Sequence, residues 1–159
     1  MLGARSVALV GASPRPGSFG ERMIIEGMRS TARIHLVNPR YDRINDVPCA
    51  PSLAALNEPV DLVLLGVPDS ALVDELQAAA AAGAKGAVVF GSAHAPGLRE
   101  ELAASATTAG MALCGAGCMG FVNNATGLRA LGYLEPDPVA SGGVSSSSAI
   151  SVVCGSSSA

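Results

Sequence analysis

Short, nearly continuous apolar runs alternate with amphipathic segments over most of the chain. Such runs are typical of strands buried on both faces of a parallel sheet. Five strands are predicted, at residues 7–10, 34–37, 60–67, 86–90 and 111–114. The segments between them place apolar residues at helical spacing, with charges elsewhere. They predict helices at residues 19–29, 70–82 and 98–109, with Gly83 and Gly110 ending the last two and a short helical turn beginning at Ser52.

This alternation of strand and helix predicts an α/β fold. We expect a Rossmann-like, doubly wound parallel sheet of about five strands, with helices on both faces. In such a sheet the ligand binds beyond the carboxyl ends of the strands. The loops at those ends are rich in Gly, Ser, Pro or Asn, and they lie at residues 11–20, 38–42, 67–70, 91–97 and 115–120.

The loop after the first strand carries the clearest candidate chemistry. Gly11 and Gly17 allow a sharp turn and a close approach of a ligand to the backbone. Ser18 is a candidate N-cap for the next helix, and the first amides of that helix favour an anion. The stretch from Gly11 to Gly20 therefore predicts a phosphate-binding turn.

The composition changes near the end of the chain. Residues 139–159 are rich in Ser and Gly, and only residues 149–154 keep strand-like content. We expect one domain over residues 1–138, followed by a tail, a linker or the stub of a further element.

Composition and charge narrow the classes of partner. Of the 159 residues, 49% are hydrophobic and 14% are charged, which suits helices packed closely on a parallel sheet. The net charge of −3 hides a basic stretch, because residues 1–43 hold seven arginines and three acids. Such a field attracts a polyanion, although arginines also decorate solvated surfaces. Without a dense basic stripe and stacking aromatics, we expect no nucleic acid as partner.

The four cysteines lack Cys-x-x-Cys spacing, and Cys114 and Cys118 flank a glycine-rich loop. We expect reduced thiols, no resident metal and a cytoplasmic location. The N-terminus leads into a strand rather than a signal peptide, and no apolar run approaches the roughly 20 residues of a membrane span. His35, inside a predicted strand, is expected to be structural, and His94, on a loop, to be exposed.

The residues alone leave the phosphate ligand open. A dinucleotide fingerprint needs Gly-x-Gly-x-x-Gly and an acid at the end of the second strand. Here the glycines are Gly11, Gly17 and Gly20, and Asn38 stands where the acid is expected. NAD fits this pattern poorly, although Arg40 suits a phosphorylated ribose. A Walker loop is excluded, because no Gly-Lys-Ser/Thr follows the first strand.

Several motifs follow one another along residues 5–135. They are Val10-Gly11-Ala12-Ser13 with Gly17-Ser18-Phe19-Gly20, Val37-Asn38-Pro39-Arg40-Tyr41, Pro59-Val60-Asp61-Leu62 with Val67-Pro68, Gly83-Ala84-Lys85-Gly86, and Cys114-Gly115-Ala116-Gly117-Cys118-Met119-Gly120. Each motif alone is weak, but their joint order is specific. It resembles the CoA-binding domain of NDP-forming acyl-CoA synthetases, which are related to the α subunit of succinyl-CoA synthetase.

The resemblance implies coenzyme A as the ligand. The first loop would hold its phosphates, the Asn-Pro-Arg segment would lie at the nucleotide end, and the later loops would line the path of adenine and pantetheine. Arg15 and Arg40 offer charge-assisted hydrogen-bond donors to the phosphates. Turn geometry alone would also explain Gly17 and Gly20. Arg15 would equally be explained as an ordinary exposed surface residue. The candidate binding residues are Gly11, Ala12, Ser13, Pro14, Arg15, Gly17, Ser18, Phe19, Asn38, Pro39, Arg40, Val67, Pro68, Gly91, Ser92 and Ala93.

One motif departs from the family pattern. The family turn commonly reads Gly-Pro-Asn-Cys-x-Gly, whereas this chain has Ala116 and Gly117 in place of Pro and Asn. We therefore assign no catalytic residue, although Cys118 matches the family cysteine. The family reaction also uses a phosphohistidine in a flavodoxin-like domain and an ATP-grasp module. We expect these as possible partner domains or subunits.

Three functions remain as hypotheses. The first is the CoA-binding domain of an acid–CoA ligase, which holds CoA for transfer of an acyl group from an acyl phosphate. The second is a stand-alone CoA-binding module without catalysis. The third is an NAD(P)-binding domain of a redox enzyme or sensor, against which Asn38 argues. The fold alone cannot choose among them.

Overall fold

The computed structural model describes residues 1–134 and 150–154. Its main element is a sheet with the strand order β3-β4-β2-β1-β5-β6-β7. Neighbouring strands are parallel except β3 and β4, which form an antiparallel hairpin at one edge. The strands are β1 (Ser6–Val10), β2 (Arg33–Val37), β3 (Arg43–Ile44), β4 (Val47–Ala50), β5 (Leu62–Leu65), β6 (Gly86–Val89) and β7 (Ala112–Cys114).

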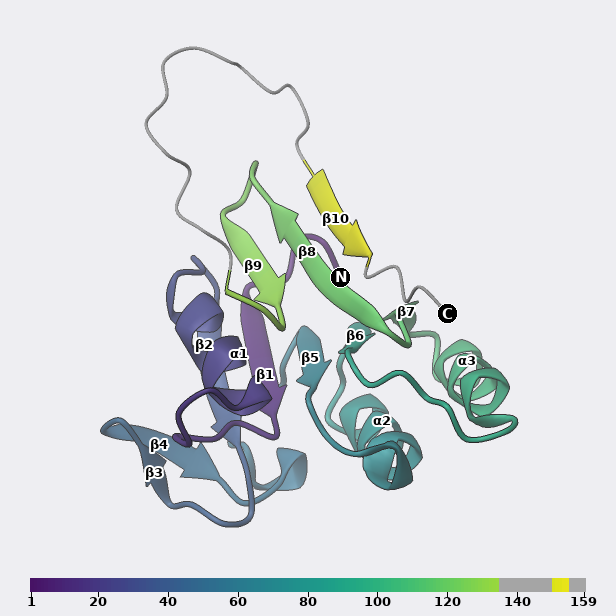
Figure 1. Cartoon of the computed structure of the whole chain (residues 1–159), viewed down its shortest axis with the longest axis horizontal. Helices are drawn as coiled ribbons and strands as arrows, with labels where there is room; N and C mark the ends of the chain where they lie inside the picture. Colours follow the sequence, from purple (N-terminus) through teal and green to yellow (C-terminus); the bar gives the residue numbers. More distant parts are fainter. Residues whose placement is uncertain (135–149, 155–159) are drawn as a thin grey trace.

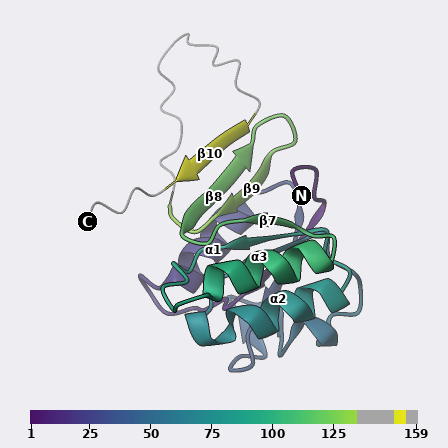
Figure 2. The same ribbon diagram turned by 90° about the vertical axis from the view of Figure 1, so that its right-hand side faces the viewer.

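Helices cover both faces of this sheet. Figure 2 shows α2 (Leu72–Ala81) and α3 (Leu98–Thr108) on one side of it, and α1 (Phe19–Met28) lies on the other. Alternate residues of β1 divide between the two sides, because successive side chains of a strand point to opposite faces. Val7 and Leu9 pack with α1, whereas Ala8 and Val10 pack with α2 and α3.

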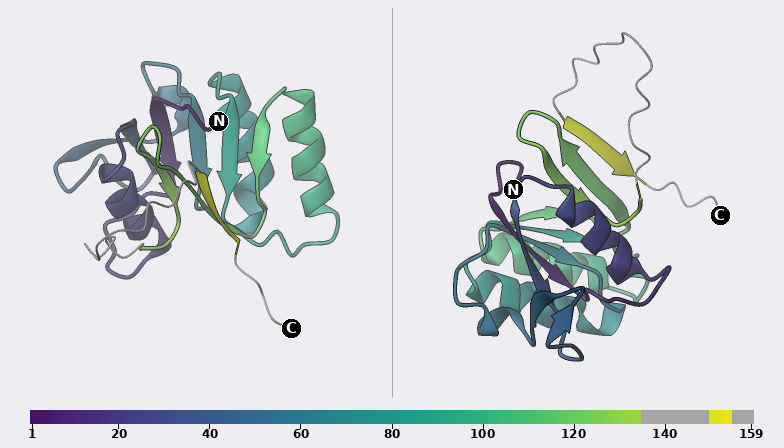
Figure 3. Two further views of the ribbon diagram at one scale, coloured as in Figure 1. Left: turned by 90° about the horizontal axis from the view of Figure 1, so that it is seen from above. Right: turned by 90° about the vertical axis from the view of Figure 1, so that its left-hand side faces the viewer.

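A second, smaller sheet lies over the α1 face (Figures 1 and 3). It has the order β10-β8-β9, all antiparallel, and consists of β8 (Cys118–Asn123), β9 (Leu128–Leu131) and β10 (Ile150–Cys154). Phe121 and Leu128 are buried in the same apolar cluster as Leu9 and Met23. At Gly120, φ is +98° and a Cβ atom would overlap the carbonyl oxygen of Ala130, so only glycine fits there.

A buried acid joins the small sheet to α1. The side chain of Glu26 has no exposed surface, and one of its oxygens accepts a hydrogen bond from Arg29 Nη1 at 2.9 Å. The other oxygen accepts two from Arg129 of β9, at 2.8 Å from Nε and 2.6 Å from Nη2. Charge-assisted bonds to two arginines compensate for the burial of the carboxylate.

The predicted α/β fold with a doubly wound, mostly parallel sheet is confirmed. The five predicted strands are β1, β2, β5, β6 and β7, and the three predicted helices are α1, α2 and α3. The expected helical turn at Ser52 is η1 (Leu53–Ala55), and the expected helix at residues 70–82 begins with a 3₁₀ turn, η2 (Asp69–Ala71). Gly83 and Gly110 follow α2 and α3 with φ of +82° and +65°, as expected for helix ends.

The structure contains strands that the sequence pattern did not predict. The sheet has six parallel strands and β3 rather than about five, because residues 43–50, where no strand was predicted, form the β3–β4 hairpin. The expected turn at residues 115–120 is shorter, since β8 begins at Cys118, and neither β8 nor β9 was predicted. These strands are stabilised by contacts far away in the sequence, which a local pattern does not report. Part of the expected tail, residues 139–149 and 155–159, lies outside the described residues.

Among residues 1–134 and 150–154, no helix combines the length and the apolar character needed to cross a bilayer.

Candidate functional site

A cleft of about 440 Å³ opens at the carboxyl ends of β1, β2 and β5. From β1 the chain leads to β2 on one side and later returns to β5 on the other, so the cleft lies at the switch point of the sheet. It collects ten of the predicted binding residues. They are Gly11, Ser13, Arg15, Ser18, Phe19, Asn38, Pro39, Arg40, Val67 and Pro68.

Close backbone packing shapes the floor of the cleft. Gly11 has φ of +91°, and a Cβ there would overlap the carbonyl oxygen of Gly66 at the end of β5. A Cβ at Gly20 would overlap the carbonyl oxygen of Gly11 and lie 2.7 Å from the amide nitrogen of Ser13. The wide glycine spacing therefore brings the start of α1 directly against the end of β1. Gly20 is explained by this packing alone.

Hydrogen bonds within the first loop hold it in shape. Ser18 is the N-cap of α1, as predicted, and its Oγ accepts from the Glu21 amide at 3.1 Å. The Glu21 carboxylate in turn accepts from the Gly17 amide at 2.7 Å, and the Ser13 hydroxyl accepts from the Arg15 amide at 3.2 Å. The loop is therefore ordered by its own residues, and the Ser13 and Ser18 hydroxyl protons can still be donated.

Asn38 connects the end of β2 to the first loop. Its side-chain nitrogen donates to the carbonyl oxygen of Ala12 at 2.7 Å, and its side-chain oxygen accepts from the Arg40 amide at 2.9 Å. A carboxylate at this position has no proton to donate to Ala12. Both the nitrogen and the oxygen of the Asn38 side chain are therefore engaged in shaping the cleft. In dinucleotide-binding folds the acid at this position binds the ribose instead.

Charge in the cleft is divided between its walls. Arg15 and Arg40 are exposed cations on the β1 and β2 side. Glu75 of α2 also lines the cleft, and burial raises the pKa of its carboxyl, with a smaller contribution from the charge of Asp74. Anionic groups of a ligand therefore belong beside the arginines rather than beside α2.

Part of the cleft lining was not predicted from the sequence. No sequence pattern marked Glu75 as a lining residue, because its position at the cleft depends on how α2 packs against the sheet. Gly66 and Tyr41 adjoin predicted residues and could have been found from that proximity. The remaining lining residues absent from the predicted set are Val10, Gly20, Val37, Pro51 and Ala71.

Six predicted residues do not line the cleft. Ala12 is fully buried, and Pro14 and Gly17 lie elsewhere in the first loop. Gly91 lies beside the cleft, since a Cβ there would be 3.3 Å from Asp69 Oδ1 and 3.7 Å from the carbonyl oxygen of Val67. The last two are Ser92 and Ala93.

The loop that holds these last residues is tied to its neighbours on both sides. Asp69 Oδ2 accepts from the amide of His94, an exposed residue, at 2.9 Å. The carbonyl oxygen of Gly91 accepts from the Gly117 amide at 2.8 Å, which links this loop to the turn between β7 and β8. Hydrogen bonds therefore link the predicted loops at the carboxyl ends of the strands, here called the rim, from η2 to that turn. The part of the rim from Gly91 to that turn lies outside the cleft.

Two cysteines face each other across the turn. The Cys114 and Cys118 sulfur atoms are 3.6 Å apart, and the Cys118 thiol also donates to the carbonyl oxygen of Val89 at 3.6 Å. The hydrogen bond between the thiols lowers the pKa of Cys114 to about 7 and raises that of the buried Cys118. The pKa values of the two thiols are therefore shifted in opposite directions.

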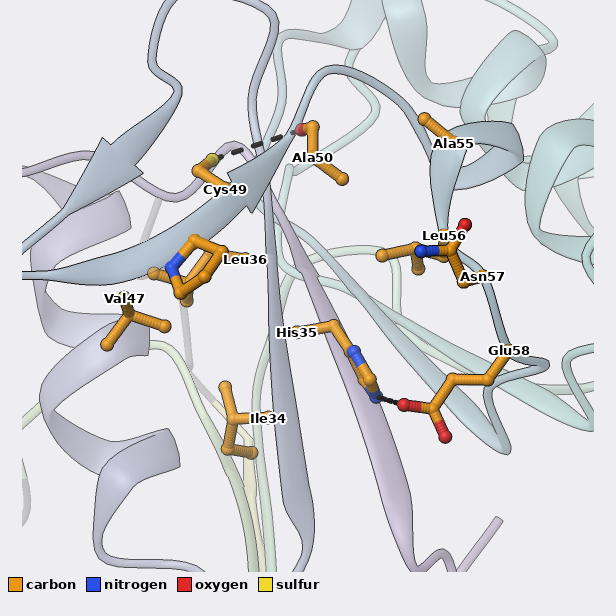
Figure 4. A pocket seen from close by; sticks show the side chains of 11 residues that line it. Ile34, His35, Leu36, Val47, Cys49, Ala50, Ala55, Leu56, Asn57 and Glu58 are labelled. Atoms are coloured by element: carbon orange, nitrogen blue, oxygen red, sulfur yellow. Dashed lines mark hydrogen bonds and ion pairs between the residues drawn. The ribbon is translucent and has the colours of Figure 1, made fainter.

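A separate cavity of about 370 Å³ lies beside β2 and β4 (Figure 4). His35 Nε2 is 3.8 Å from Glu58 Oε1 there. Cys49 also lines it, and burial raises the pKa of its thiol. Within the described part of the chain, no three His, Cys, Asp or Glu side chains gather as a metal site.

Comparison with known proteins places these features in context. Residues 5–124 match the family model described as CoA binding domain. An ADP-forming acetate–CoA ligase I of Archaeoglobus fulgidus is 32% identical over 130 residues, which are 78% of this chain and 19% of that protein. The chain spans about a fifth of the length of the curated relatives that it matches first.

Solved structures share the fold. An acetyl-coenzyme A synthetase 1 of Ca. Korarchaeum cryptofilum, described as dinucleotide forming and in complex with phosphate and ADP, is 25% identical with a TM-score of 0.75. The match covers 80% of this chain and 29% of that one. A conserved hypothetical protein from Pyrococcus furiosus is 28% identical with a TM-score of 0.59, and the match covers 69% of this chain and 91% of that one.

Proposed function

Because the chain belongs to the CoA binding domain family, we propose that the cleft at the switch point holds coenzyme A as a substrate. One observation carries this proposal: residues from three separate loops line one cleft that has two arginines on one wall. Sequence relatives named acetate–CoA ligases support the same ligand.

The charge distribution orients the ligand. The phosphates lie beside Arg15 and Arg40, where guanidinium groups and the first amides of α1 stabilise negative charge. Asn38 and Pro39 form the nucleotide end. Adenine and pantetheine follow the rim past Pro68, toward the segment made of Gly91, Ser92 and Ala93. The glycines of the first loop allow the phosphates to approach the backbone.

We propose that this domain works within an acid–CoA ligase. In that reaction the CoA sulfur attacks the carbonyl carbon of an acyl phosphate, the thiol loses its proton, and the bond to the phosphate oxygen breaks. Holding the thiol in reach of the acyl group is the contribution of this chain. The phosphohistidine and ATP-grasp parts belong to other domains or subunits.

Calorimetry tests the ligand directly. We expect saturable binding of CoA, weakened about tenfold by Arg15→Ala, because a charge-assisted hydrogen bond to phosphate is lost. Arg5→Ala is the matched control, since Arg5 precedes β1 at the opposite end of the strand and is also exposed. Titration with NADPH separates CoA from a dinucleotide. Absence of CoA binding at millimolar ligand, or equal effects of the two variants, would contradict the proposal.

A stand-alone CoA-binding module is the second candidate. The Pyrococcus furiosus protein favours it, because the match takes up 91% of that chain and so leaves little room for further domains. Both candidates bind CoA, so binding does not separate them. Reading the gene on both sides of the codons for this chain does, since a ligase needs the further domains there or in a neighbouring gene.

A further inference from the structure

Cys114 and Cys118 form a close pair with unequal surroundings. Cys114 ends β7 and is partly exposed, whereas Cys118 begins β8, is buried and contacts the carbonyl oxygen of Val89. Their sulfur atoms are 3.6 Å apart across the turn at residues 115–117. Both thiols are free. The pair therefore combines one partly exposed cysteine with one buried cysteine.

This arrangement separates the roles of the two thiols. The hydrogen bond between the two sulfurs lowers the pKa of Cys114 to about 7, which leaves much of Cys114 ionised near neutrality. A thiol with a pKa close to the ambient pH is the best attacking group in disulfide exchange. The hydrogen bond with Cys114, burial and the charge of Cys114 all raise the pKa of Cys118, so Cys118 stays protonated until Cys114 has reacted.

We propose that Cys114 and Cys118 form a thiol–disulfide exchange site that accepts disulfides of small thiols. Cys114 is the attacking residue and Cys118 is the resolving residue. The site does not depend on the proposed CoA cleft, because neither sulfur lines that cleft.

The exchange takes two steps. The Cys114 thiolate attacks one sulfur of the small disulfide, forms a mixed disulfide and releases one small thiolate, which takes up a proton. Cys118 then loses its proton, attacks the Cys114 sulfur and releases the second small thiol. The net reaction oxidises two protein thiols to one disulfide and reduces one small disulfide to two thiols.

The turn gives the reaction a structural consequence. Gly117 lies between the two cysteines, and its amide donates to the carbonyl oxygen of Gly91. Closing the pair draws the ends of this turn together and so acts on the rim segment that includes Gly91. The reduced and oxidised forms should therefore differ in protection of that segment from hydrogen exchange.

Glutathione disulfide is the probe for the test. The reduced chain is incubated with it, quenched in acid, alkylated, digested with trypsin and analysed by mass spectrometry. Trypsin leaves residues 100–129 as one peptide, because Arg99 and Arg129 bound a stretch without Lys or Arg, so both cysteines stay together. We expect this peptide to lose two hydrogens, and Cys114 to react at least about tenfold faster than the buried Cys49.

Single variants separate the two roles. Cys118→Ser should retain glutathione as a stable adduct on Cys114, whereas Cys114→Ser should leave Cys118 unmodified. If either variant folds poorly, the wild-type digest alone still tests whether the disulfide forms within peptide 100–129.

Cys154 provides the competing outcome, because it lies opposite Cys118 in the register of β10 and β8. A disulfide between them would join peptides 100–129 and 130–159. That product, or reaction of Cys114 no faster than Cys49, overturns the proposal, and a Cys154→Ser variant that still forms the internal disulfide supports it.

Discussion

The two faces of the central sheet are covered in different ways. On one face, α2 and α3 directly follow the strands that they cover, and the interface consists of small and branched apolar side chains. On the other face, α1 shares the cover with β8 and β9, which come about 90 residues later in the chain, and charged side chains take part. The first face is built from local βα units, whereas the second is assembled by long-range contacts.

The comparison concerns how strictly apolar and charged contacts restrict the arrangement of the elements that they join. Apolar side chains pack on a sheet without a strict partner. A buried carboxylate needs its own donors, so Glu26 accepts only an arrangement that brings Arg29 and Arg129 to it. We therefore expect the buried charge to specify where the small sheet packs against α1.

The largest effect is expected from breaking this charged contact. Arg129→Ala removes two donors from a fully buried carboxylate, so we expect a loss of about 4 kcal/mol in the free energy of unfolding. Urea denaturation measures it. Arg33→Ala, which removes an exposed ion pair with Glu58, is the control and should cost less than about 1 kcal/mol. Similar losses of unfolding free energy in both variants would mean that the buried Glu26 carboxylate does not need the Arg129 donors of β9.

An apolar truncation probes the opposite face. Leu76→Ala on α2 removes a side chain that is 1% exposed, and we expect a loss of about 3 kcal/mol from the cavity left behind. The control is Ile25→Ala on α1, whose side chain is 41% exposed and should matter little. Thermal and urea unfolding both report the change. A larger loss at Ile25 would place a hidden apolar contact on the α1 face.

A smaller, chemical effect is expected where β8 begins. Cys118→Ala removes the hydrogen bond that lowers the pKa of Cys114, so this pKa should rise from about 7 toward the ordinary 9.0. Near pH 7 less thiolate is then present, and alkylation of Cys114 should slow about tenfold, with little change above pH 9. The pH profile of iodoacetamide labelling measures it. An unshifted profile would show that another group stabilises the thiolate.

The smallest effect concerns the start of α1, where Ser18 is the N-cap. Ser18→Ala removes the N-cap acceptor of the Glu21 amide, and we expect a loss of about 1 kcal/mol in stability. Ser70→Ala, an exposed serine in η2, is the matched control and should be close to neutral. Comparison with Arg129→Ala then shows whether α1 is held mainly through β9 or by its own local bonds.

Part of the molecule could be predicted because its causes are local. The apolar run of β1, the glycines of the next loop and the cap at Ser18 all act within a few residues of one another. Asn38 was placed correctly at the end of β2 from its position after an apolar run. Its two hydrogen bonds could not be inferred, because Ala12 is 26 residues away.

Other parts depended on distances that a sequence does not state. Glu75 reaches the cleft only because of the way α2 is set on the sheet. Gly91 and its two neighbours stay outside the cleft, although their order along the chain suggested the same role as Val67. The sequence predicts reduced thiols at Cys114 and Cys118, and only the short turn into β8 brings their sulfurs into contact.

By itself, the sequence determined the alternation of five strands with three helices, the glycine-rich turn between β1 and α1 and the family resemblance. Periodicity, glycine conformation and helix capping are properties of short segments, so they survive without the rest of the molecule. The tertiary structure decided which loops share the cleft, where the small sheet lies and which cysteines meet. These depend on packing between distant residues, and packing is settled only when both partners are in place.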